Sequence, residues 1–440
     1  MQFRVLIVLS SLYISTAVSA QGLLSIYQQA KTTDPVWLGA KAGNRAAQEA
    51  SKQSLAAFLP NASLSGNTTS NFRDSKSFNT FIPDRREKYN SNAWTLSITQ
   101  PVFRMANYAS HRQAKASVRQ SDIELAASAQ DLILRVAQAY FDVLSAETEL
   151  TSVKAEKKAI ARQLDQAQKR FEVGLIAITD VHEAQASHDL ASAQEIAAEN
   201  SLLLARVALS EITGEEYRDL NQLNDEIDLL MPDPANIEDW VERALEHNLS
   251  LAAAKTAVEV AQENVKIQQA GHYPTLDLVA TGGNSVSKGG NFGSETDSST
   301  LSLQFSVPIY AGGAVVSQTR QALAELEQAR QSLKQSKRAT ERQVRNAYLG
   351  IIAGISRIQA LKQAVISAQS AVDATEAGFE VGTRTIVDVL NVQRSLYRSQ
   401  SDYQVARYAY LLNGLQLKQA VGSLSEDDLA SIDQLLKKSP

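Results

Sequence analysis

The feature that most limits what this chain can fold into is a turn that occurs twice. Residues 171–181 read FEVGLIAITDV and residues 379–389 read FEVGTRTIVDV, so seven of eleven positions match at a separation of 208 residues. The match continues upstream, because Tyr140 recurs as Tyr348 at the same separation. Self-similarity at a fixed offset indicates repeated structural units. We therefore predict an internal duplication in which each half carries one such turn.

The duplication divides the chain into five predicted segments. In order they are a signal peptide, a first repeat, a linker, a second repeat and a C-terminal segment, over 1–20, 21–214, 215–235, 236–422 and 423–440. The first segment has Arg4 as its only charge, then an apolar stretch, and it ends in small residues up to Ala20. That pattern is typical of a cleaved secretory signal, with a membrane anchor as the alternative. The linker and the C-terminal segment are predicted to be equatorial elements on the side of the helices.

Two very long helices are predicted, one in each repeat. Apolar residues alternate at spacings of four and three from Leu125 to Val153, and again from Val344 to Val372. This is the narrow stripe of a coiled coil. No proline interrupts 105–170 or 314–378. At ~1.5 Å per residue each helix spans on the order of 100 Å, which is far longer than a membrane requires.

Four short segments alternate between apolar and polar residues. They lie at about 60–71, 92–103, 274–284 and 299–310. In the last of them Leu301, Leu303 and Phe305 alternate with Ser302 and Gln304. Period two with one apolar face and one Ser/Thr/Gln face is typical of a strand with lipid outside and water inside. A half-buried sheet of a soluble protein is the alternative.

Polar segments and prolines frame these strands. The stretches 71–91 and 285–299 are rich in Asn, Ser and charge and are predicted to be surface loops. A proline is predicted to mark every junction between strand and helix, since proline removes a backbone donor and restricts the residue before it. These prolines are Pro60, Pro101, Pro274 and Pro308.

Four strands cannot close a barrel, and each open edge would leave unpaired backbone groups in lipid. The barrel must therefore be shared between chains. Two chains would give about eight strands with an interior filled by side chains, whereas three would give about twelve and leave an aqueous lumen. Four chains also satisfy the need for closure.

Composition argues against several functions. The chain has no cysteine, and its 48 acidic and 43 basic residues form no basic patch that would suit nucleic acid. His182 and His188 do not make a zinc motif, because a spacing of six puts the two rings well apart around a helix. No phosphate loop or nucleophile motif appears. We predict no enzyme activity, no cofactor and no metal.

Several motifs resemble the TolC family of outer-membrane tunnel proteins of Gram-negative bacteria. They are the two turns, 173–181 and 382–390, together with GHYPTLDL at 271–278 and PIYAGG at 308–313. The resemblance covers nearly the whole chain after the signal. It implies a mixed fold, in which a homotrimer builds a 12-stranded β-barrel and a coiled-coil α-helical tunnel in the periplasm.

The resemblance also implies function and partners. Such proteins are passive export ducts in the outer membrane lipid, and they serve tripartite multidrug efflux pumps and type I protein secretion. Their partners are a periplasmic adaptor and an inner-membrane transporter of the RND, ABC or MFS type. A trimeric coiled-coil surface adhesin anchored by its strands is the alternative, although its usual single C-terminal anchor does not fit two hairpins.

The same resemblance assigns roles to residues of the turns. Asp180 would pair with Arg384 to hold the periplasmic entrance closed, and Asp388 would point inward to form an anionic ring. The family's second acidic ring falls on Asn391, and the family's latch tyrosine falls on Phe379, which cannot donate a hydrogen bond. The adaptor would dock on two tripeptides of the turns, Val173-Gly174-Leu175 and Val381-Gly382-Thr383.

Helix capping offers a simpler role for the two acidic residues. Thr385 and Asp388 have the spacing of a capping box, and Asp180 also falls near a helix start. One carboxylate can serve as both cap and pore charge. Gly174 and Gly382 are needed for tight turns whatever binds there.

Overall fold

The computed structural model describes residues 21–437 except 77, 79–80, 82–83 and 290–292. The predicted signal peptide, 1–20, lies outside the described residues. The chain forms two compact units, each built from segments that are distant in sequence. The first unit holds the chain up to Leu38, Ala129–Ala244 and the chain from Gln343, and the second holds Gly39–Ser128 and Leu245–Arg342.

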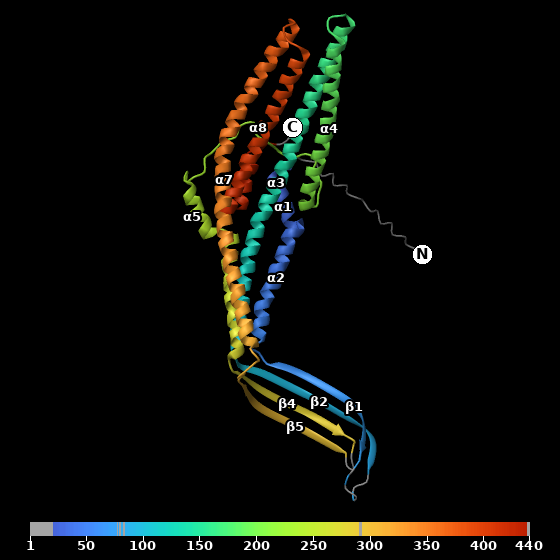
Figure 1. The fold of residues 1–440 in the computed structure, drawn as a ribbon, viewed down its shortest axis with the longest axis vertical. Helices are drawn as coiled ribbons and strands as arrows, with labels where there is room; N and C mark the ends of the chain where they lie inside the picture. Colours follow the sequence, from blue (N-terminus) through green and yellow to red (C-terminus); the bar gives the residue numbers. More distant parts are fainter. Residues whose placement is uncertain (1–20, 77, 79–80, 82–83, 290–292, 438–440) are drawn as a thin grey trace, which may run out of the picture. The chain divides into compact units, whose positions relative to one another are not determined.

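Helices account for most of the described chain (Figure 1). In order they are α1 Leu23–Thr33, α2 Pro35–Ala56, α3 Met105–Glu172, α4 Ile178–Thr213, α5 Ile237–His247, α6 Leu249–Gln269, the short 3₁₀ helix η1 Ala270–His272, α7 Ala314–Glu380, α8 Ile386–Ala420 and α9 Glu426–Asp433. The strands are β1 Asn61–Ser75, β2 Arg85–Arg104, β3 Gln222–Leu223, β4 Thr275–Ser287, β5 Ser294–Ser306 and β6 Leu436–Lys437.

The second unit contains the predicted four-stranded sheet, and its strand order is β1-β2-β4-β5 with antiparallel pairing throughout (Figure 1). Directly opposed residues share a face of a sheet. Across β2, β4 and β5, Ile98, Ala280 and Leu301 lie opposite one another on one face. In the next row, on the other face, Ser97, Thr281 and Thr300 lie opposite one another. The prediction of four strands with an apolar and a polar face is confirmed.

The strands reach further into the predicted loops than alternation predicts, although β5 ends at Ser306 rather than at about 310. β1 continues to Ser75 and β2 begins at Arg85, so most of 71–91 is strand rather than surface loop. β4 and β5 likewise extend into 285–299. Beyond the apolar band both faces carry polar residues, so the period-two signal disappears while backbone pairing continues.

The predicted position of Pro101 is also wrong, because Pro101 lies inside β2 rather than at a junction between strand and helix. The pairing between β2 and β4 shifts there, with Pro101 opposite Asp277 and Phe103 opposite Leu276. A bulge lets a strand accept a residue that has no backbone donor. The strand then continues to Arg104, whose guanidinium binds Asp277 at 2.7 and 2.9 Å.

The first unit is helical, and it contains the two turns of the sequence duplication. One turn joins α3 to α4 and the other joins α7 to α8, so each repeat forms a helical hairpin (Figure 1). As predicted, α3 and α7 run without a break, over 68 and 67 residues. By length and composition alone one described helix, α7, could also cross a membrane, with a window of mean hydropathy 1.3. That signal is weak, because coiled-coil helices rich in Ala and Ile give similar values.

The core of the first unit lies where α1, α3, α4, α8 and α9 meet. The predicted stripe of α3 is buried there, including Leu132, Val136 and Val143. Two aromatic contacts extend this core, since Phe141 stacks on Tyr408 with ring centroids 5.6 Å apart and meets Tyr140 edge-on. The Tyr140 hydroxyl donates to the carbonyl of Asn221 at 2.6 Å, which fixes the chain after α4.

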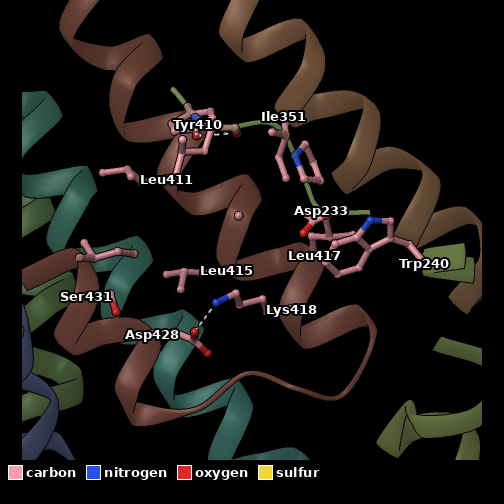
Figure 2. Close-up of a pocket in the computed structure, with 14 residues that line it drawn as sticks. Asp233, Trp240, Ile351, Tyr410, Leu411, Leu415, Leu417, Lys418, Asp428 and Ser431 are labelled. Atoms are coloured by element: carbon pink, nitrogen blue, oxygen red, sulfur yellow. Dashed lines mark hydrogen bonds and ion pairs between the residues drawn. The ribbon is translucent and has the colours of Figure 1, made fainter. Parts of the chain in front are cut away.

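Tyrosine and tryptophan side chains also hold the segment between β3 and α5 (Figure 2). The Tyr410 hydroxyl accepts from the Leu230 amide at 2.9 Å and donates to the Leu230 carbonyl at 3.0 Å. Trp240 Nε1 donates to the Pro234 carbonyl at 2.8 Å. These bonds leave a recess of about 330 Å³ beside Tyr410 and Trp240.

Candidate functional site at the hairpin tips

The two turns have the same backbone hydrogen bonds as well as similar sequences. Gly174 adopts φ +76° and Gly382 adopts φ +78°, a region in which only glycine is free of strain. The Gly174 amide donates to the Phe171 carbonyl and the Leu175 amide to the Arg170 carbonyl, at 2.9 and 2.8 Å. Each helix therefore ends in a Schellman motif.

The second turn repeats this pattern, with Gly382 donating to Phe379 and Thr383 to Gly378, at 3.1 and 2.8 Å. The residues predicted to dock an adaptor are exposed in both turns. Val173 is 69% exposed, Leu175 72% and Val381 75%. Apolar side chains this exposed at a loop tip indicate a contact surface.

Asp388 caps α8. Its Oδ2 accepts from the amide and the hydroxyl of Thr385, both at 2.9 Å, and its own amide donates to the Thr385 hydroxyl at 3.2 Å. The bond from the Thr385 backbone lowers the pKa of Asp388, and the Thr385 hydroxyl and Arg384 lower it further. Among the described residues no bond falls on Oδ1, so the carboxylate keeps an oxygen for another role. Asn391, one turn further on, is exposed.

Asp180 and Arg384 form no ion pair with each other within the described part of the chain. Asp180 lies in the first turn of α4, whose N-cap is Ala177, and its amide donates to the Ala177 carbonyl at 3.1 Å. The Arg384 amide donates to the Gly378 carbonyl at 3.2 Å. Its side chain lies so close to Gly378 that a Cβ built there would be 2.8 Å from Arg384 Cγ.

Phe379 contacts the other hairpin through a side chain that sequence reasoning missed. The Arg170 guanidinium lies over its ring, 4.5 Å from the centroid. Phe379 also packs against an apolar cluster that joins the hairpins, with Ile160 and Ala184 from one and Ile386 and Leu390 from the other. Within one chain, the tips therefore meet through a cation–π contact and apolar packing.

Two polar contacts between α3 and α8 lie further from the turns. Arg394 Nε donates to Glu156 Oε1 at 3.2 Å, and the Ser401 hydroxyl donates to Glu149 Oε2 at 2.7 Å. Glu156 is only 7% exposed, so the bond from Arg394 compensates its carboxylate for much of the hydration that it loses. The sequence does not reveal either contact, because both depend on how two distant helices are aligned.

A sheet with one apolar face, hairpins of coiled-coil helices and apolar hairpin tips together define the class of outer-membrane channel proteins with a helical part. The family model of outer membrane efflux proteins matches residues 26–215 and 240–423. The chain belongs to the outer membrane efflux protein family.

Individual relatives agree with this assignment. The chain is 41% identical to the outer membrane protein TolC of Vibrio cholerae over 428 residues, which cover 96% of each chain. It is 32% identical to the alkaline protease secretion protein AprF of Pseudomonas aeruginosa, covering 93% of this chain and 86% of that one. The solved outer membrane protein VceC of Vibrio cholerae has the same fold, with a TM-score of 0.75 at 22% identity over 91% of this chain and 96% of that one.

The family decides between the two sequence-based hypotheses in favour of the export duct over the adhesin. The protein is an outer membrane export duct of a Gram-negative bacterium, with a helical periplasmic part, and it is not an enzyme. Proteins of this family work in tripartite systems with a periplasmic adaptor and an inner-membrane transporter.

Proposed function

We propose that three copies of this chain form one channel, each supplying four strands of a twelve-stranded barrel. The observation that carries this proposal is the open sheet. In the described chain β1 pairs only with β2, and β5 only with β4. Each unpaired backbone group in lipid costs several kcal/mol, so β1 of one copy should pair with β5 of the next. Three copies leave room for water beside the Ser and Thr face.

The surface of α4 supports the same assembly. It carries five large apolar side chains, each at least half exposed, which are Leu190, Ile196, Leu203, Leu204 and Val207. A helix that exposes this much apolar surface in a coiled-coil protein favours a partner helix. A neighbouring copy would supply that helix and continue the hairpins into a closed tunnel.

The hairpin tips are proposed to gate this tunnel. Asp388 would supply an anionic ring of three carboxylates, and Asn391 would add no charge to it. Arg384 and Asp180, which do not pair within one chain, would pair between neighbouring copies. Exposed pairs of this kind contribute only ~0–1 kcal/mol, which suits an entrance that a partner has to open.

The exposed apolar tips are proposed to dock the adaptor. Val173, Leu175 and Val381 would supply the contact surface. Gly174, Gly382 and Thr383 would set its shape through the paired Schellman turns. A transporter of the RND, ABC or MFS type would supply the energy, because the duct itself has no catalytic machinery.

Two kinds of cargo are proposed, small toxic molecules and secreted proteins. The family name supports efflux, and the similarity to an alkaline protease secretion protein supports type I secretion. We further propose that the signal 1–20 is removed. The repeats 21–214 and 236–422 would be two copies of one ancestral hairpin unit, separated by 215–235 and followed by 423–440.

Conductance across a planar bilayer tests the channel and its gate. The purified protein should form cation-preferring pores of low open probability. Arg384→Ser should raise the open probability by about fivefold, because it removes the weak Arg384–Asp180 ion pair at each contact between neighbouring copies. Asp388→Ala should lower the cation preference and the block by multivalent cations.

Three outcomes would count against the proposal. Protein that stays monomeric in membranes would refute the shared barrel. The absence of conductance in the trimer would refute the duct. Unchanged currents in both variants would leave Asp388 and Arg384 as helix-capping residues with no part in a gate.

A further inference from the structure

The recess beside Tyr410 and Trp240 has the size and the walls of a binding site for a small molecule (Figure 2). Its volume is about 330 Å³, and pockets for small ligands start at about 300 Å³. The walls come from α5, α7, α8, α9 and the segment between β3 and α5, all of which lie in the first unit. Most of the lining is apolar or aromatic, and Leu411, Leu415 and Ile432 are buried parts of it.

The segment that closes one side of the recess is fixed at both ends. The Tyr410 hydroxyl binds the amide and the carbonyl of Leu230, and Trp240 Nε1 binds the Pro234 carbonyl. These bonds hold the backbone on either side of Asp233. A site whose walls are already held in place loses less conformational entropy when a ligand binds.

The hydrogen-bond donors around the recess already have acceptors. The two aromatic donors bind backbone carbonyls. The Lys418 ammonium binds the Asp428 carboxylate, and the Ser431 hydroxyl donates to the Asp427 carbonyl at 2.8 Å. A ligand that offers only acceptors therefore gains little from these groups.

Asp233 is the acceptor that remains available. Among the residues that the structure describes, no hydrogen bond or ion pair falls on its carboxylate. Figure 2 shows Asp233 beside Trp240, on the opposite side of the recess from Leu415. The lining holds two carboxylates, Asp233 and Asp428, against the one ammonium of Lys418, so its formal charge is −2 + 1 = −1. This charge attracts a cation and repels an anion.

We propose that the recess binds an amphipathic cation, whose apolar body packs against Leu411 and Leu415 and whose ammonium group donates to the Asp233 carboxylate. The faces of the Tyr410 and Trp240 rings also favour a cation over an anion. Asp233 is exposed in the free chain, and a bound apolar body excludes water from one side of the carboxylate, which strengthens the ion pair. No residue of the two turns lines the recess, so this binding is a function separate from the proposed gate.

Three ligands with the same aromatic body and different charges test the site. They are naphthylethylammonium, naphthylethanol and naphthylpropanoate, titrated by calorimetry into the assembled protein in amphipathic polymer. Each protein carries Asp388→Ala, which removes the proposed pore carboxylates as a second attraction for a cation. The ammonium should bind at least about fivefold more tightly than the alcohol, because it adds an ion pair, and the carboxylate should bind most weakly.

Substitution of Asp233 should remove this order of affinity. Asp233→Asn should bind the ammonium and the alcohol about equally, and the retained binding of the alcohol shows that the recess is intact. Asp233→Glu should keep the preference for the ammonium. Asp228→Asn is the matched control, because Asp228 is an exposed acid of the same segment that does not line the recess.

Hydrogen exchange locates the bound ligand. Naphthylethylammonium should slow exchange of the backbone amides of 229–240 in the Asp228→Asn protein, and the effect should be much weaker in the Asp233→Asn protein. The inference is overturned by a lack of saturable binding, by equal affinity for the ammonium and the alcohol, by a preference that survives Asp233→Asn, or by protection confined to other segments. Neither measurement depends on conductance, so the proposed duct can fail while this binding holds.

Discussion

At the scale of single residues, Gly378 determines where Arg384 can lie. A Cβ at this position would be 2.8 Å from Arg384 Cγ, closer than side chains tolerate. Cγ is only two bonds from the Arg384 backbone and has little freedom to move, so in a Gly378→Ala variant the whole Arg384 side chain, including its guanidinium, would have to change direction. Gly378→Ala should therefore imitate Arg384→Ser and raise the open probability in planar bilayers by about fivefold.

The control is a glycine of the same hairpin with open space around it. Gly414 lies within α8, and a Cβ there would meet nothing within 4 Å. Gly414→Ala should leave conductance unchanged and raise helix stability by about 0.5–1 kcal/mol. Currents that stay at the native level in Gly378→Ala would show that Arg384 has no role in closing the entrance.

Much of the tip was predictable residue by residue, but its contacts were not. The repeated Phe-Glu-Val-Gly fixes a Schellman turn through local hydrogen bonds, and Thr385 and Asp388 cap α8 through spacing alone. The Arg170–Phe379 contact depends on how two hairpins meet. The Glu156–Arg394 and Glu149–Ser401 contacts depend in the same way on how α3 and α8 are aligned, and nothing local in the sequence identifies these partners.

At the scale of elements, the start of α8 should respond to pH through Asp388. Its pKa is lowered by the bonds from Thr385. A carboxyl whose pKa is lower in the folded chain than in the unfolded chain stabilises the fold at pH values above its unfolded pKa of about 3.9. That stabilisation is lost as the pH falls through the folded-state pKa. The first turn of α8 should therefore fray on acidification below about pH 4.

A spin label at Asn391→Cys, one turn beyond Asp388, measures this fraying. In the otherwise native chain the label should become more mobile as the pH falls from about 5 to about 2.5. This range extends roughly one pH unit to either side of the pKa of an ordinary carboxyl group. Thr385→Ala removes the two bonds of the Thr385 hydroxyl and keeps the bond from the backbone amide, so its label should already be more mobile than the native label at about pH 5. A native label that does not change on acidification would contradict the capping role.

The limits of the strands show the same division between local and distant causes. Leu301, Leu303 and Phe305 mark β5 by alternation, and the structure confirms that strand. The extension of β1 to Ser75 and the bulge at Pro101 are set by the partner strands, whose backbone groups need pairing whether or not the side chains alternate. Sequence patterns carry no record of that requirement.

At the scale of the whole molecule, the exposed apolar surface of α4 should control assembly. Ile196 and Leu203 are spaced by one heptad and are 69% and 60% exposed. Changing both to Gln should weaken the contact between copies by about 2–4 kcal/mol, because burial of each side chain no longer contributes. Native mass spectrometry in detergent should then show less trimer at a given concentration.

Two exposed polar positions of the same helix supply the comparison. His182→Gln and Glu183→Gln alter α4 without removing apolar surface, and they should leave the trimer fraction unchanged. An undiminished trimer fraction in the Ile196→Gln, Leu203→Gln variant would mean that α4 does not lie between copies.

The unpaired edges of β1 and β5 make assembly of the channel depend on how soon the copies meet. In the proposed shared barrel, a newly exported chain carries two unpaired strand edges until other copies arrive, and such edges can pair with any extended peptide nearby. Productive maturation therefore depends on the local supply of identical chains, and it slows steeply when expression falls. At low expression we expect chains to be lost to proteolysis or aggregation before they assemble. The expression level, more than the stability of the single folded chain, then determines how many assembled channels a cell contains.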